Sequence, residues 1–177
     1  MRRGRRCVKQ AGISMEKLKK EIIGLLVENA RYTYGQLADI LGVEESRAEQ
    51  AVKELENSGV IVKYAAIVNN EALAEKSVEA LIEVKVAPQK LKGFDSYAEE
   101  IYSFKEVQSL FLMSGGFDLA VFVKGRDLSD IARFIAEKLS VIDGITSVQT
   151  HFILKKYKIE GQIASPSEEH KRQIVQA

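Results

Sequence analysis

The 177-residue sequence contains few residues that could build a covalent or metal-bound framework. Its single cysteine, Cys7, excludes an internal disulfide framework and any thiolate cluster for zinc or iron–sulfur. Two histidines, His151 and His170, argue against a multi-histidine metal site, so we expect no metal and no cofactor. No apolar run approaches the roughly 18–20 residues of a membrane-spanning helix, and the basic N-terminus is not followed by the apolar stretch of a secretory signal. The sequence therefore predicts a reduced, cytoplasmic protein without a membrane partner.

The chain also lacks a dominant charge, because 26 Lys and Arg residues face 25 Asp and Glu residues. Five of the basic residues lie within residues 1–14, which contain no acid, so the remaining 163 residues carry 21 basic and 25 acidic residues. Two interpretations of this basic, disordered arm remain open. It could bind nucleic-acid phosphates, or it could be a dispensable extension with Met15 as an alternative start. The second is favoured because regular patterning begins only at Ser14–Met15.

Residues 15–60 carry the pattern of three short helices. Ser14 can cap a first helix that runs to about Asn29, and Thr33 followed by Gln36 forms a capping-box pattern before a second helix that ends at Gly42. A third helix is predicted over 45–57, with Ala48, Val52 and Leu55 facing inward and Gly59 as its stop. A short helix, a tight turn and an amphipathic helix make up a helix-turn-helix, a pattern typical of DNA-binding proteins but weakly specific.

The third helix carries mixed evidence for DNA binding. Residues 15–64 contain seven basic and nine acidic residues, and this excess of acids repels phosphate.

The β-branched run that follows, 60–68, predicts a connecting strand within a linker over 61–77.

Residues 78–157 alternate between strand and helix patterns. Strands are predicted over 78–86, 107–113, 117–123 and 145–155, and helices over 91–104 and from Asp127 to Gly144. The second helix should bury these side chains: Leu128, Ile131, Phe134, Ile135, Leu139 and Ile142. The order predicts a ferredoxin-like βαββαβ domain, followed by a solvated tail or short terminal helix over 158–177. The predicted fold class is thus α+β, with an N-terminal helix-turn-helix (winged-helix-like) unit and a C-terminal ferredoxin-like domain.

A four-stranded sheet with helices on one face leaves the other face to solvent, a ligand or a partner. That face should carry apolar side chains, namely Leu81, Phe111, Phe122 and Ile153. Self-association would cover it, so we expect a homodimer and a further homo-oligomer.

At this point the sequence resembles the Lrp/AsnC (feast/famine) transcriptional regulators. The resemblance spans about 16–155 and rests on four segments in order: 29–33, 36–38, 55–61 and 113–118. It implies double-stranded DNA as a partner of the N-terminal unit. The side chains expected to contact DNA are Lys20, Arg31, Thr33, Tyr34, Arg47, Gln50 and Lys53. Family members usually start the recognition helix with Ser and carry an Arg halfway along it, and by register these positions are Glu44 and Ala51.

The resemblance also implies an amino acid or similar small effector, bound between subunits near the central hairpin. The expected effector-binding residues are Met113, Ser114, Gly115, Gly116, Phe117 and Asp118. Independently of the family, the N–H groups of two glycines can hold a carboxylate, and Asp118 can hold an ammonium. The alternative is a plain hairpin turn in which Asp118 bonds backbone.

Three functions from different classes remain. The first is a ligand-responsive, DNA-binding transcriptional regulator. The second is a small-molecule-binding oligomeric assembly protein with weak or no DNA binding, which the acidic third helix favours. The third is a dimeric ferredoxin-like enzyme. No nucleophile set, phosphate-binding loop or paired carboxylates are visible, so we propose no catalytic residue and predict that the protein is not an enzyme.

Overall fold

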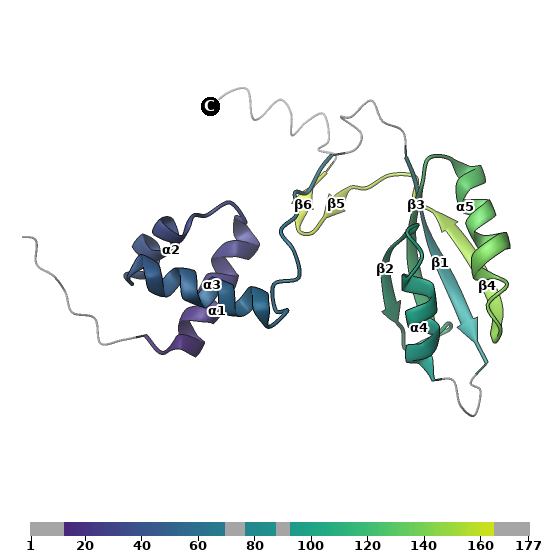
Figure 1. Cartoon of the computed structure of the whole chain (residues 1–177). Helices are drawn as coiled ribbons and strands as arrows, with labels where there is room; N and C mark the ends of the chain where they lie inside the picture. Colours follow the sequence, from purple (N-terminus) through teal and green to yellow (C-terminus); the bar gives the residue numbers. More distant parts are fainter. Residues whose placement is uncertain (1–12, 70–76, 88–92, 165–177) are drawn as a thin grey trace, which may run out of the picture. The chain divides into compact units, whose positions relative to one another are not determined.

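The computed structural model describes residues 13–69, 77–87 and 93–164. The chain divides into two units, 1–66 and 67–177 (Figure 1). Residues 1–12, predicted to be a basic arm, and residues 165–177, predicted to be part of a tail or short helix, lie outside the described residues. No helix in the described part of the chain is long and apolar enough to cross a membrane.

The first unit contains three helices, α1 (Met15–Glu28), α2 (Tyr34–Leu41) and α3 (Glu45–Asn57). The predicted caps form. The Ser14 hydroxyl accepts a hydrogen bond from Lys17 N, Thr33 and Gln36 make a reciprocal capping box, and Gly42 ends α2 in the left-handed conformation. The apolar faces of the three helices form one core: Leu18, Ile22, Leu37, Ala38, Ala48, Ala51, Val52 and Leu55.

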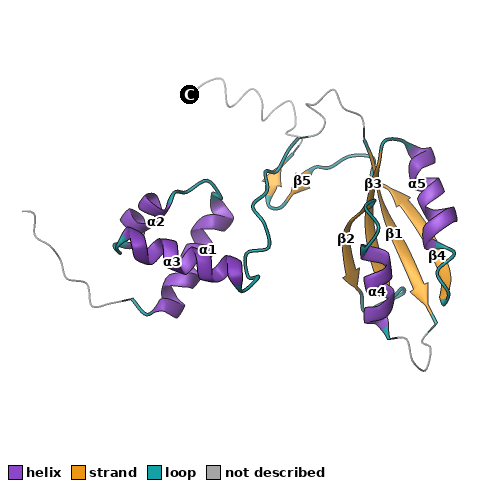
Figure 2. Cartoon of the chain, viewed as in Figure 1, coloured by secondary structure: helices purple, strands orange, loops and turns teal. Residues whose placement is uncertain are grey.

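The second unit contains β1 (Val78–Val86), α4 (Phe94–Tyr102), β2 (Val107–Leu112), β3 (Leu119–Gly125), α5 (Leu128–Phe134) and β4 (Ile145–Phe152). The strands form an antiparallel sheet in the order β2-β3-β1-β4, and both helices lie on one face of it (Figure 2). This is the predicted ferredoxin-like arrangement. Its core lies between sheet and helices, with alternate β1 residues Ala80, Ile82 and Val84 against Tyr97 and Ile131.

Three expectations about local structure were wrong. The predicted strand over 60–68 is not a strand, because β-branched residues need a partner strand and these described residues have none. Residues 158–164 are not a plain tail, since β5 (Lys158–Ile159) and β6 (Gln162–Ile163) form a small hairpin. Leu128 is 56% exposed, because it is the first residue of α5 and the helix enters the core only one turn later, at Ile131.

Helix α5 continues as a π-helical turn over Ile135–Leu139, so the helix ends at Leu139 and not at Gly144, where the sequence predicted its stop. That turn buries Leu139 completely.

Candidate functional site

The predicted DNA-contacting residues lie on all three helices of the first unit. Lys20 on α1 and Arg31 in the turn before α2 are exposed, and their side chains bond no other described residue. Thr33 is occupied by capping, since its hydroxyl accepts the Gln36 N–H at 3.2 Å. Tyr34 is half-buried against the helical core.

The predicted donors on α3 are already engaged within the unit. The Lys53 ammonium lies 2.7 Å from a Glu49 carboxylate oxygen, which raises the pKa of Lys53, and the Gln50 amide donates to Glu54 at 2.9 Å. Glu54 also forms an ion pair with Lys19 of α1, whose Nζ lies 2.7 Å from Glu54 Oε2. Acids of α3 therefore neutralise Lys53 of the same helix and Lys19 of α1, so this face offers phosphate less positive charge than its residue types suggest.

Arg47 lies at the first turn of α3 and is half-buried, with its guanidinium donating to the backbone carbonyl of Ile13. This contact ties the chain just before α1 to the start of α3. Ile13 therefore lies beside the start of the helix that is expected to read DNA.

The structure corrects the register of the recognition helix. Ala51 is fully buried in the three-helix core. A DNA-contacting arginine could not occupy that position, because its charge would be buried among apolar side chains. The exposed positions on either side of it are Gln50 and Lys53, so those residues, and not Ala51, face outward halfway along α3.

The predicted effector residues come together in the connection between β2 and β3. The Met113 N–H donates to the Asp118 carbonyl at 2.8 Å, and the Asp118 N–H donates to the Val84 carbonyl at 3.0 Å, which fixes the connection to β1. The Asp118 carboxylate accepts the Val86 N–H through Oδ2 at 2.9 Å. Its Oδ1 accepts no hydrogen bond from any described residue, so Asp118 combines a structural role with an available anionic oxygen.

The two glycines of this turn differ. Gly115 has φ +156°, which side chains rarely adopt, so the turn itself favours glycine there. Gly116 has no positive φ, and a Cβ on it would meet no atom within 4 Å. The fold of a single chain therefore gives no reason for glycine at 116, whereas close approach by a ligand or a second subunit does.

The sheet face away from the helices carries an aromatic pair and a polar pair. Phe111 and Phe122 pack edge to face with ring centroids 6.0 Å apart. On the same face, His151 Nε2 lies 3.2 Å from Glu83 Oε1. Sequence reasoning missed the second pair. Alternation places both side chains on one face, but only the pairing of β1 with β4, which matches Leu81 to His151, brings them together.

The geometry first defines the class of protein: a helix-turn-helix unit joined to a ferredoxin-like domain with a glycine-rich central hairpin. Family models agree with both halves. Residues 15–62 match a winged helix-turn-helix DNA-binding domain, and residues 79–163 match the Lrp/AsnC ligand-binding domain.

Comparison with known proteins then gives the family. The chain is 38% identical to an uncharacterized HTH-type transcriptional regulator, YugG, of Bacillus subtilis over 92% of this chain and 99% of that protein. It is 32% identical to the HTH-type transcriptional regulator LrpA of Pyrococcus abyssi over 81% of this chain and 99% of that one. Among solved structures, the L-Met complex of a transcriptional regulator from Neisseria meningitidis shares the fold with a TM-score of 0.62 at 24% identity, covering 90% of this chain and 99% of that one. The chain belongs to the Lrp/AsnC family and is a transcriptional regulator with a helix-turn-helix and a ligand-binding domain.

Proposed function

We propose that this regulator binds an α-amino acid at the 113–118 turn and couples that binding to its assembly on DNA in the cytoplasm. The observation that carries the proposal is the Asp118 carboxylate, which keeps Oδ1 available while Oδ2 is held by Val86 N. An α-amino acid presents a carboxylate and an ammonium side by side. Backbone N–H groups at Gly115 and Gly116 suit the first, and Asp118 suits the second.

The neighbouring side chains suggest an apolar ligand side chain. Leu112 and Met113 are exposed beside the turn, and Phe117 is half-buried. The Neisseria regulator is described in complex with L-Met, an amino acid of this kind.

We further propose that a second copy of the chain completes this site. Leu112, Met113 and Phe111 form an exposed apolar run at the edge strand β2, and a single subunit leaves the turn open. Burial of this run and of the Phe111–Phe122 face would stabilise a homodimer and then a larger ring. Light scattering at micromolar concentration should show a species larger than the monomer, and a monomer would contradict the proposed assembly.

The effector is tested by calorimetry with the twenty amino acids on the parent and on Asp118→Asn. We expect one or a few apolar amino acids to bind the parent and to bind the variant at least tenfold more weakly, because the variant loses the charge that faces the ammonium. If no amino acid binds, or if the variant binds equally well, the 113–118 turn is a structural turn and not an effector site.

DNA binding is tested by a gel shift on the DNA upstream of the protein's own gene at several salt concentrations. Binding should weaken steeply with salt, because phosphate contacts carry it. Arg47→Ala should weaken the free energy of DNA binding by about 1–3 kcal/mol if Arg47 reads a base edge, and by less if it meets only phosphate.

The second candidate, an assembly protein without DNA binding, is favoured by the ion pairs within and around α3. Absence of binding at low salt, for both 1–177 and 15–177, would establish that alternative.

A further inference from the structure

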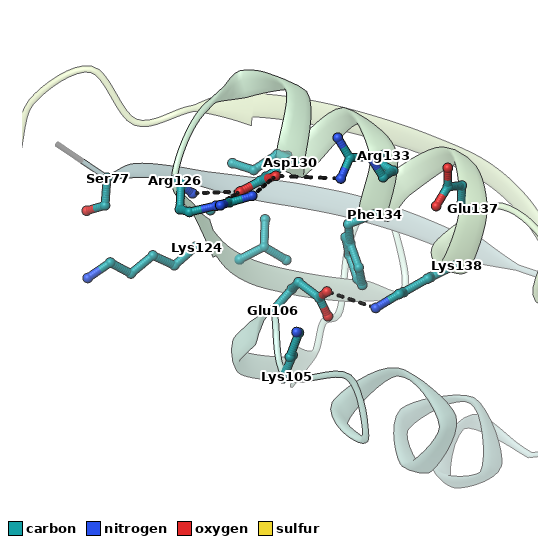
Figure 3. A pocket seen from close by; sticks show the side chains of 13 residues that line it. Ser77, Lys105, Glu106, Lys124, Arg126, Asp130, Arg133, Phe134, Glu137 and Lys138 are labelled. Atoms are coloured by element: carbon teal, nitrogen blue, oxygen red, sulfur yellow. Dashed lines mark hydrogen bonds and ion pairs between the residues drawn. The ribbon is translucent and has the colours of Figure 1, made fainter.

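A cavity of about 1050 Å³ lies on the helix side of the second unit, between the end of β3, α5 and the loop after α4 (Figure 3). All of its lining residues belong to this unit, from Ser77 to Lys138. It is separate from the effector turn: the turn precedes Leu119 at the start of β3, whereas the cavity adjoins Gly125 at the end of that strand. At roughly 3.3 Å per residue, about 20 Å of strand separates them.

Positive charge dominates the lining. Five of its lining residues are basic, namely Lys105, Lys124, Arg126, Arg133 and Lys138. Three are acidic, namely Glu106, Asp130 and Glu137. Lys138 is held by Glu106 at 2.8 Å, and Arg126 by Asp130 at 2.7 Å. The other three cations remain available to an anion. Arg133 reaches Asp130 only at 3.9 Å, and neither Lys105 nor Lys124 forms an ion pair with a described residue.

Glu106 pairs with Lys138 and thereby takes that lysine out of the set of cations available to an anion. Its Oε1 accepts from Lys138, but its Oε2 is buried and has no partner among the described residues. The ammonium of Lys138 holds the pKa of Glu106 below its usual value, so this oxygen is an anionic acceptor. Because Oε2 is buried, a molecule in the cavity does not reach it, so Glu106 contributes negative charge beside Lys138 and no contact with a ligand.

The apolar part of the lining comes from Val123, Ile131 and Phe134. These side chains give a carbon body something to pack against, while Figure 3 shows Lys105 below Glu106 and Lys138 beside it. A volume of this order fits a metabolite-sized ligand.

We propose that this cavity binds a small organic anion, with its phosphate or carboxylate on Lys105, Lys124 or Arg133 and its carbon body against the apolar part of the lining. The ligand occupies one subunit, is held by side chains rather than by the 113–118 turn, and is distinct from the amino-acid effector.

The test uses the full chain with two probes, glucose 6-phosphate and L-glutamate, and glucose as the neutral control. Calorimetry gives the affinity, and backbone amide chemical shifts give the location. We expect at least one anionic probe to bind saturably, with shifts centred on residues 105–106 and 123–138, and glucose not to bind. Binding by glucose 6-phosphate alone would identify phosphate as the recognised group, and binding by L-glutamate alone would identify carboxylate.

Variants separate this site from the turn. Lys105→Ala removes an exposed lysine with no ion-pair partner among the described residues, so it should leave folding intact and weaken the probe about tenfold, the effect of losing one charged hydrogen bond. Lys158→Ala, which removes an exposed lysine from β5, should leave the affinity unchanged, and so should Asp118→Asn. The proposal is overturned if neither anion binds at millimolar concentration, if glucose binds as well as the anions, or if the shifts centre on residues 113–118.

Discussion

The carboxylate of Asp118 accepts the backbone N–H of Val86 at 2.9 Å, at the place where β1 shifts its register against β4. The pairing of β1 with β3 ends at Val84 and Leu119, so the N–H of Val86 lies beyond the regular ladder, and the side chain of Asp118 satisfies it. One oxygen of the carboxylate thus fixes the turn to the sheet, and the other remains for a ligand.

This double role predicts that two substitutions at Asp118 will differ. Asp118→Ala leaves the Val86 N–H without its acceptor and should lower the free energy of unfolding by about 1–3 kcal/mol. Asp118→Asn keeps an acceptor oxygen and should cost less than half of that, while losing the charge needed for an ammonium. Urea unfolding measures the first effect, and calorimetry with the amino acid that the parent binds measures the second. Equal stability of the two variants would show that the Val86 contact contributes nothing to folding.

The burial of Ala51 predicts the outcome of placing the family's arginine at that position. Ala51→Arg should lower the stability of the first unit by more than about 3 kcal/mol, because a long charged side chain is forced into a filled core. Asn57→Arg, at the exposed end of α3, is the matched control and should leave stability nearly unchanged. Helical circular dichroism during thermal unfolding measures both. A stable Ala51→Arg variant with stronger DNA binding would restore the original register.

The Lys53–Glu49 pair predicts that α3 restrains its own affinity for DNA. Glu49→Gln removes a negative charge and frees the Lys53 ammonium, now 2.7 Å from Glu49. At low salt the variant should bind duplex DNA more tightly, by about 1 kcal/mol, and the gain should shrink as salt screens it. Glu28→Gln, at the exposed end of α1, should change affinity little. Weaker binding by Glu49→Gln would mean that α3 does not face phosphate.

Acid should weaken the second unit through Asp130. Arg126 donates to both carboxylate oxygens of Asp130, at 2.7 and 3.1 Å, and chiefly for this reason the pKa of Asp130 falls from 3.8 to about 2. A lowered pKa in the folded state stabilises the protein above the unfolded value of 3.8, and this contribution is lost as the pH falls towards 2. Urea unfolding of the parent and of Arg126→Gln should therefore converge between pH 4 and pH 2. Arg31→Gln, in the other unit, is the control and should show no such convergence.

The first residues of three helices were predictable from sequence because the causes are local. Ser14, Thr33 and Asp127 cap helices by accepting N–H groups three residues ahead, and such a pattern can be found without knowing the fold. The ferredoxin-like order was predictable for the same reason, since strand alternation and helical spacing are properties of short segments.

Features that depend on distant partners were not predictable. The 60–68 run has strand composition, but a strand exists only where another strand accepts its hydrogen bonds. The His151–Glu83 contact depends on strand register, and the basic cavity joins residues from 77 to 138 through packing that no local pattern encodes.

The unlike glycines of the turn give the sharpest test of close approach. Gly115→Ala should destabilise the isolated fold, because φ +156° is unfavourable for a residue with a Cβ. Gly116→Ala should leave folding unchanged or slightly more stable, since no atom of the described residues lies within 4 Å of the added methyl group and alanine reduces the freedom of the unfolded chain. If a ligand or second subunit closes on this backbone, the same methyl group should weaken amino-acid binding or assembly by tenfold or more. Gly93→Ala, where a Cβ also meets no atom within 4 Å and φ is −76°, is the matched control and should alter neither. Urea unfolding, calorimetry and light scattering on the three variants separate folding from function. A Gly116→Ala protein that binds and assembles like the parent would show that nothing approaches the backbone of Gly116 closely, and would leave Asp118 as the remaining reason for placing the effector at this turn.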